Sequence, residues 1–121
     1  MDNYEVLVGK VIDWAAERGI FDKGDALAQL DKTQEELDET ILAVKEYRTS
    51  ALDQESISKA EDEVADGSGD MLVTIIIAAR MVNLDTTYCL QMAYDEIKNR
   101  TGKMVDGKFV KDKSNINDYH R

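Results

Sequence analysis

Two clusters of carboxylate side chains are the residues of this sequence that could do chemistry. The first lies in TQEELDE and contains Glu35, Glu36 and Glu39; the second lies in EDEVADGSGD, just before the apolar run MLVTIIIAA, and contains Glu63, Asp66 and Asp70. On a helix with about 100° per residue, Glu35, Glu36 and Glu39 fall within an arc of about 100°. One cation could therefore bind two of these three carboxylates. Oxygen ligands of this kind suit hard divalent cations.

The first cluster also has a simpler explanation. Acidic residues on a helix usually form its solvated face. Here the apolar residues Leu30, Leu37, Ile41 and Val44 lie roughly opposite the acids, as they would on an amphipathic helix. Taken alone, the first cluster therefore favours a solvated face.

The second cluster is less easily explained in this way. Glu63, Asp66 and Asp70 stand at i, i+3 and i+7, on a stripe that continues into Val73 and Ile77. Burial of unpaired ionised carboxylates is costly. A stripe of acids that runs into the core therefore predicts either cationic partners or a metal ion.

Composition limits the fold and the partners. A chain of 121 residues is long enough for one domain, over residues 1–121, and its lack of proline favours long helices in an all-α fold. A net charge of −10 without a Lys/Arg stripe argues against polymeric nucleic acid as a partner. The single cysteine, Cys89, rules out a disulfide framework, and no segment has the pattern of a signal peptide or a membrane span. We therefore expect a cytoplasmic protein without a membrane partner.

Hydrophobic periodicity predicts four helices, over residues 4–18, 26–47, 59–83 and 86–100, in a four-helix bundle-like arrangement. The second helix carries the first acidic cluster, with Asp25 as its N-cap, and the third helix carries the second cluster. The second half of the third helix is apolar nearly all round, which predicts the most buried element. Residues 50–58 are polar and predict a connection. Gly67 and Gly69 indicate either close approach by another backbone or a ligand, or a local kink.

The pattern changes after the fourth helix. Side chains alternate around Asp106-Gly107, a dipeptide typical of a type I′ turn, so a short β-hairpin is expected over about residues 103–112. The helical part would then cover about residues 4–102, and residues 113–121 would form a tail. Charged and polar residues gather between the helix and the hairpin, and they are Asp95, Lys98, Asn99, Arg100 and Lys103. Their cations either offset the helix dipole or bind an anion.

The ordered acidic motifs resemble those of a known family. Glu35-Glu36-x-x-Glu39 has the form EExxE, and Glu63-x-x-Asp66 has the form ExxD after a gap of 23 residues. With WAAERGI, QLDKTQEELDE, DGSGDMLVTIII and AYDEIKNRTGK, they resemble the small phage and bacterial MazG-like nucleoside triphosphate pyrophosphohydrolases over nearly the whole chain. These belong to the all-α NTP pyrophosphatase group.

One departure concerns the second motif of that family. The family's acidic pair usually ends at the Asp of a Gly-Asp step, here Gly69-Asp70, and the residue three positions before this Asp is Gly67. The second pair is therefore either Glu63 with Asp66 or Asp66 with Asp70. We favour Asp66 with Asp70.

The resemblance implies hydrolysis of a (deoxy)nucleoside triphosphate between its α- and β-phosphates, with Mg²⁺, or Mn²⁺ as a substitute, and release of pyrophosphate. It implies that the metal ligands are Glu36, Glu39, Glu63, Asp66 and Asp70. It also implies that Glu35 or Glu36 is the catalytic base that accepts the proton of the attacking water. The residues expected to bind the substrate are Lys32, Asp95, Lys98, Asn99, Arg100 and Lys103, with the cations on its phosphates.

A homo-oligomer, either a dimer or a tetramer, is expected. One helix that is apolar nearly all round and a protruding hairpin leave more apolar surface than one small bundle can cover. The resemblance also implies paired subunits, with the active site near the interface.

Two other functions have to be weighed. A di-iron carboxylate protein would use Glu-x-x-His motifs on two helices, but the only histidine is His120 in the tail. A non-catalytic acidic module that binds a nucleotide or a partner protein stays open, with the acids as a solvated face. The base of a nucleotide is not specified, because Trp14, Tyr47, Tyr88 and Tyr94 could each stack on a base or pack in the core.

Overall fold

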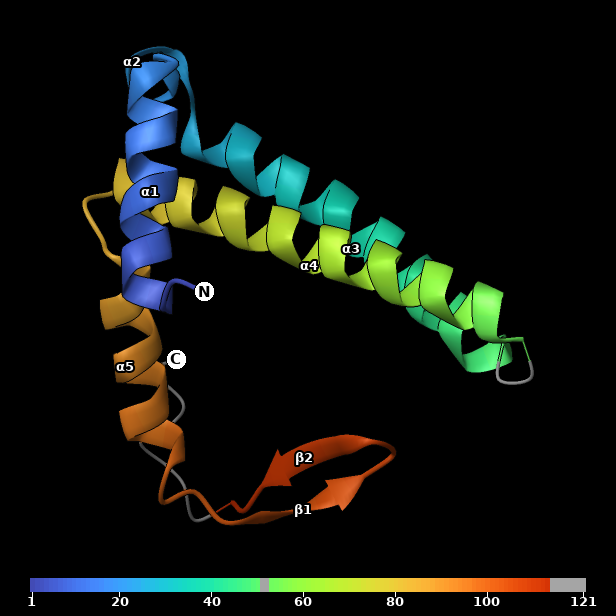
Figure 1. The fold of residues 1–121 in the computed structure, drawn as a ribbon. Helices are drawn as coiled ribbons and strands as arrows, with labels where there is room; N and C mark the ends of the chain where they lie inside the picture. The colour runs from blue at the N-terminus through green and yellow to red at the C-terminus, as the bar shows by residue number, and fades with distance from the viewer. Residues whose placement is uncertain (51–52, 114–121) are drawn as a thin grey trace. The chain divides into compact units, whose positions relative to one another are not determined.

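The computed structural model describes residues 1–50 and 53–113. In chain order its elements are α1 (Tyr4–Glu17), α2 (Ile20–Lys23), α3 (Ala26–Thr49), α4 (Gln54–Met81), α5 (Thr86–Ile97), β1 (Gly102–Val105) and β2 (Lys108–Lys111) (Figure 1). The predicted all-α fold with a C-terminal hairpin is confirmed. The chain divides into two compact units, Met1–Thr86 and Thr87–Arg121. The single domain over residues 1–121 stays a prediction.

The helix boundaries differ from the predicted ones mainly at the start of α4. This helix begins at Gln54 rather than at residue 59, because Asp53 caps it. The backbone N–H of Glu55 donates to Asp53 Oδ1 at 3.1 Å, and the Ser56 hydroxyl donates to Oδ2 at 2.5 Å. These bonds, the Ser56 bond first, hold the pKa of Asp53 below its ordinary value. Residues 54–58 of the predicted connection are therefore helical, and residues 51–52 lie outside the described residues.

The short helix before α3 was not predicted, whereas α3 begins at Ala26 as expected. The single turn α2 lies between the predicted helices over residues 4–18 and 26–47, after Gly19, which has a left-handed φ of 72°. Asp25 stands at the N-cap position of α3, as expected, but its side chain makes no capping hydrogen bond. The Asp25 carboxylate therefore does not fix the start of this helix.

α3 and α4 run antiparallel and side by side in the first unit (Figure 1). Their contact line is formed by small and hydroxyl residues. Thr33 Oγ1 and Thr74 Oγ1 share a hydrogen bond of 2.7 Å, and Gly67 is buried so closely against Thr40 that a Cβ at this position would overlap the Thr40 hydroxyl. The close approach that Gly67 indicated is thus made by another helix. At Gly69, in contrast, a Cβ would meet nothing within 4 Å.

The bulky apolar residues of α3 lie beside this contact line and are partly exposed. Leu30, Leu37, Ile41 and Val44 are 48%, 39%, 43% and 41% exposed. By helical geometry they lie about a quarter-turn from the contact line, whereas Glu39 lies about a quarter-turn the other way. The α3–α4 pair therefore has two flanks. The apolar flank consists of Leu30, Leu37, Ile41, Val44, Val64, Met71 and Ile75, and the acidic flank consists of Glu36, Glu39, Glu63, Asp66 and Asp70.

The buried core of the first unit lies around the second half of α4. Ile76, Ile77 and Ala78 are buried there, and Val8 and Ala15 of α1 are buried as well. The predicted burial of this half of α4 is confirmed only in part, because Leu72 and Ile75 on the same stretch are exposed.

The second unit contains α5 and an antiparallel hairpin. Strand pairing runs from Gly102 opposite Lys111 to Val105 opposite Lys108. The turn residues Asp106 and Gly107 have φ angles of 50° and 80°, the positive values that a type I′ turn requires. The predicted hairpin is confirmed, although α5 ends at Ile97 rather than at residue 100. Residues 114–121 of the predicted tail lie outside the described residues.

Candidate functional site

One pocket on the acidic flank is lined by five carboxylate residues from two helices. They are Glu36 and Glu39 of α3 and Glu63, Asp66 and Asp70 of α4, and Gly67 completes the lining. The pocket has a volume of about 350 Å³. All five predicted metal ligands thus line one pocket, and both alternatives for the second acidic pair belong to it.

The contact line explains why the acids of the two helices meet. Gly67 lies against Thr40, and the Thr40 hydroxyl donates to the backbone oxygen of Glu36 at 2.7 Å. Because Gly67 has no side chain, the two backbones are close at this level. Carboxylates that project from the same side of each helix then border a single space. Gly67 therefore has a structural role in the contact between the two helices.

The electrostatic field in the pocket is strongly negative. Desolvation is the largest cause that raises the pKa of Glu36 above its ordinary value, and the charges of Glu39, Asp70 and Glu35 raise it further. Lys32 opposes them, so its charge lies close enough to act on Glu36. Glu36 is half-buried, beside the contact line.

The second acidic cluster does not run into the core as expected. The buried line of α4 passes through Gly67, Thr74 and Ile77, whereas Asp66 and Asp70 lie beside it and are exposed. Glu63 is half-buried, and its Oε1 lies 3.9 Å from Lys59 Nζ. The acids therefore border an open pocket, where ionised carboxylates are far less costly than in a core.

The donor set of the pocket suits a hard divalent cation, because it contains carboxylate oxygens alone. As the side chains stand, however, no three Asp, Glu, His or Cys residues within 1–50 and 53–113 form a group that could hold a metal ion. The exposed side chains of Glu39, Asp66 and Asp70 would have to turn toward one another to share a cation. Rotation of surface side chains is fast and has a low cost.

The other predicted site residues are divided between the two units. Lys32 and Glu35 act electrostatically on Glu36, although Glu35 does not line the pocket. The rest of the predicted substrate-binding set belongs to the second unit, and it consists of Asp95, Lys98, Asn99, Arg100 and Lys103. There, Lys98 Nζ lies 3.4 Å from Asp95 Oδ1, which also accepts a hydrogen bond from Gln91. Substrate binding by this set stays a prediction.

A second hollow adjoins the acidic pocket, because Asp70 lines both. It has a volume of about 420 Å³, and its other lining residues are Leu7, Lys10, Val11, Trp14 and Val73. Trp14 is 44% exposed as a residue, and the guanidinium of Arg18 lies over one face of its ring, 4.5 Å from the ring centre. Sequence reasoning named Trp14 as a ring that could stack on a base but missed this hollow, whose signal is the helical spacing of Leu7, Val11 and Trp14.

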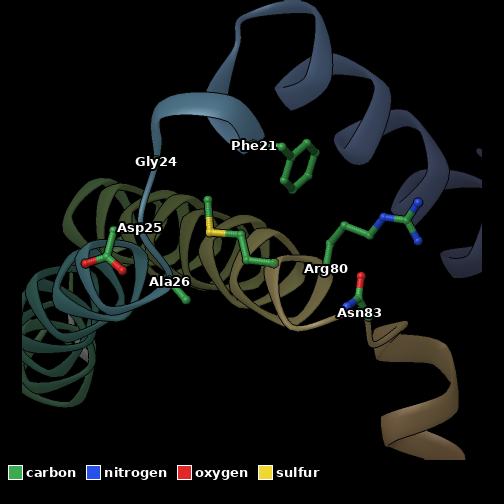
Figure 2. Close-up of a pocket in the computed structure, with 7 residues that line it drawn as sticks. Phe21, Gly24, Asp25, Ala26, Arg80 and Asn83 are labelled. Carbon is green, nitrogen blue, oxygen red and sulfur yellow. The ribbon is translucent and has the colours of Figure 1, made fainter.

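A larger hollow, of about 570 Å³, lies where α2 and the start of α3 meet the end of α4. Figure 2 shows Phe21 and Arg80 toward one end of it and Asp25 toward the other. With one carboxylate and one guanidinium apart from each other, this hollow has no cluster of like charges. The acidic pocket is therefore the stronger candidate for chemistry.

Comparison with family models, with curated proteins and with solved structures found no match for this chain. The resemblance to MazG-like pyrophosphohydrolases therefore stays a prediction. Taken one at a time, the helices of the described residues all fall short of the length and apolar character needed to cross a membrane.

Proposed function

We propose that this protein hydrolyses (deoxy)nucleoside triphosphates to the monophosphate and pyrophosphate, with Mg²⁺ as the cofactor. The observation that carries the proposal is the single pocket lined by five carboxylates from α3 and α4. A triphosphate would be repelled by these carboxylates unless divalent cations stood between them. Carboxylate oxygens are the protein ligands that Mg²⁺ prefers.

The residues in and beside the pocket have two roles in this proposal, cation binding and proton transfer. Glu39, Glu63, Asp66 and Asp70, together with Glu36, would hold the cation. When bound, Mg²⁺ supplies positive charge to phosphate oxygens and makes water more acidic. Glu35 or Glu36 would accept the proton of the attacking water, and Glu36 is the one of the two that lines the pocket.

The surroundings of the pocket also support this choice of substrate. Lys32 is a cation close to Glu36 and can pair with a phosphate oxygen. The adjoining hollow offers apolar walls and the exposed ring of Trp14, which suit a nucleoside. The two hollows share Asp70, so one ligand could place its phosphates in the first and its base in the second.

The test is product analysis on a panel of ribonucleoside and deoxyribonucleoside triphosphates, with Mg²⁺ and with EDTA. We expect equal amounts of monophosphate and pyrophosphate with Mg²⁺ and no turnover with EDTA. Release of inorganic phosphate with the diphosphate would contradict the proposed bond cleavage. Binding of a nucleotide without any turnover would favour the non-catalytic acidic module instead.

A further inference from the structure

The acidic pocket is built from a short repeat in the sequence. Each copy of the repeat has a lysine, an acid four positions later and a second acid three positions after that. The two copies are Lys32, Glu36 and Glu39 on α3, and Lys59, Glu63 and Asp66 on α4. The offset between the copies also relates Thr40 to Gly67, which touch at the contact line. Each helix therefore carries one cation and two carboxylates at equivalent positions.

The helix contact turns this repeat into a local two-fold arrangement within the first unit. Thr40 and Gly67 lie opposite each other, and the hydrogen bond between Thr33 and Thr74 gives the two helices the same antiparallel register. Each lysine precedes the contact residue of its own helix by two turns, and the two chains run in opposite directions. The lysines therefore stand at opposite ends of the acidic flank, about 24 Å apart along the pair at 1.5 Å per residue.

Each lysine acts on the first acid of its own copy. Lys59 Nζ lies 3.9 Å from Glu63 Oε1, and the charge of Lys32 acts on Glu36. A lysine four positions before a glutamate is the less stabilising order of such a pair on a helix, and an exposed pair contributes little. Helix stability is therefore a weak reason for the two lysines. A cation at each end of an acidic pocket suits a long anionic ligand better.

The two ends of the pocket differ in what lies beside them. Asp70 breaks the two-fold arrangement, because the equivalent position of α3 holds Ala43. By its helical position Asp70 lies toward Lys32, and it also lines the hollow that contains Trp14. The opposite end, at Glu63, has no aromatic residue among those that line the pocket. A base therefore has a ring to stack on at one end only.

We propose that the triphosphate lies along the pocket in one direction, with its nucleoside at the Asp70 end and its terminal phosphates at the Glu63 end, where Lys59 binds them. This inference rests on the proposed function, because it assigns the two ends of the same pocket. Glu63 would serve the cation, and the Lys59 ammonium would turn from Glu63 to a phosphate oxygen. After hydrolysis the pyrophosphate lies beside Lys59, and the monophosphate lies at the Asp70 end.

The test is isothermal titration calorimetry on the full chain in millimolar Mg²⁺, with pyrophosphate and with AMP, GMP, CMP and UMP as ligands. Lys59→Ala removes the cation at the Glu63 end. Lys45→Ala is the matched control, because Lys45 is also exposed but points away from α4 and from the pocket. We expect Lys59→Ala to weaken pyrophosphate binding at least about tenfold, as loss of a charge-assisted hydrogen bond does. Lys45→Ala should leave it unchanged, and Lys59→Arg should restore most of it.

The direction of the ligand is tested by the monophosphates. Lys59→Ala should leave the affinity for the tightest-binding monophosphate nearly unchanged, whereas Trp14→Ala should weaken that affinity and leave pyrophosphate binding nearly unchanged. Three results would overturn the proposal: a parent that binds no pyrophosphate, equal pyrophosphate affinities of Lys59→Ala and Lys45→Ala, or a Lys59→Ala variant that weakens a monophosphate and not pyrophosphate.

These outcomes are separate from those of the proposed function. A chain that releases pyrophosphate from triphosphates, but binds pyrophosphate equally well with Lys59→Ala, would keep the hydrolysis and overturn the assignment of Lys59. A chain without turnover, whose pyrophosphate binding is lost with Lys59→Ala and kept with Lys45→Ala, would contradict the hydrolysis and support Lys59 as a phosphate-binding residue.

Discussion

The acidic flank and the apolar flank belong to the same two helices, yet they differ in chemistry. Between them, Thr33, Thr40, Gly67 and Thr74 hold α3 and α4 together with small side chains and hydroxyl groups. The bulky apolar residues are therefore left for one flank and the carboxylates for the other. The difference teaches that close backbone approach holds the middle of this helix pair together, so that neither the carboxylates nor most of the bulky apolar residues need to lie on the contact line.

The largest effect should come from neutralising one acid of the pocket. Glu39→Gln or Asp70→Asn removes a carboxylate with little change in volume, so turnover should fall at least about a hundredfold, or about 3 kcal/mol in the barrier. The folded state without metal should become more stable, because one of several like charges is gone. Rates of pyrophosphate release and melting temperatures in EDTA measure the two effects.

A matched control for that prediction lies on the same helix. Asp38 is exposed and does not line the pocket. Asp38→Asn should therefore have a much smaller effect than Glu39→Gln, both on turnover and on stability in EDTA. Equal effects of Asp38→Asn and Glu39→Gln would mean that turnover and stability depend on the total charge of the chain and not on the carboxylates of the pocket.

The contact line can be disturbed without replacing any carboxylate or bulky apolar residue of the two flanks. Gly67→Ala forces a methyl group onto Thr40 and should destabilise the fold by about 1–3 kcal/mol, as overpacking does. Gly69→Ala meets nothing within 4 Å and should stabilise α4 by up to about 1 kcal/mol. Chemical denaturation of both variants in EDTA measures the difference, and equal stabilities would contradict the described contact between α3 and α4.

The two groups of cations should differ in their effect on substrate binding. Lys32 acts on Glu36, so Lys32→Ala should raise the Michaelis constant several-fold, as expected for one lost charge-assisted phosphate contact. Joint replacement of Lys98 and Arg100 by Ala should also raise it if these residues bind phosphates. An unchanged Michaelis constant in the double variant would return them to the role of helix-terminus cations.

The smallest effect concerns pH. The folded-state pKa of Glu36 is raised above the ordinary value of 4.5, so the folded protein keeps this proton at pH values where the unfolded chain has lost it. The stability gained by that proton is present below pH 4.5 and is lost as the pH rises through the raised pKa. In EDTA, Glu36→Gln should therefore flatten the fall in stability between pH 4.5 and neutrality. A parallel pH profile for parent and variant would show that Glu36 titrates normally.

Much of the fold followed from local patterns in the sequence. Periodicity identified the four long helices, and Asp106-Gly107 identified the hairpin turn, because these signals depend on neighbours in the chain. The early start of α4 was missed because its first turn, after the Asp53 cap, is mostly polar and shows no periodic apolar residues. The short helix α2 was missed because a single turn has no periodicity to detect.

The candidate site was predictable in its members but not in its environment. Helical spacing placed Glu63, Asp66 and Asp70 on one stripe, and the five proposed ligands do line one pocket. Which side of α3 meets α4 could not be read from spacing alone. The apolar residues of α3 predicted a packing face along their own row. Thr40 and Gly67 instead allow the two helices to come closer than bulky side chains would.

The central claim is that the acidic flank is a divalent-cation site, and the melting temperature with and without Mg²⁺ tests it most directly. A cation that binds only the folded state must stabilise it. We predict that the parent melts several degrees higher in millimolar Mg²⁺ than in EDTA, that Glu39→Gln loses most of this rise, and that Asp38→Asn keeps it. A parent whose melting temperature is the same in Mg²⁺ and in EDTA would contradict the account.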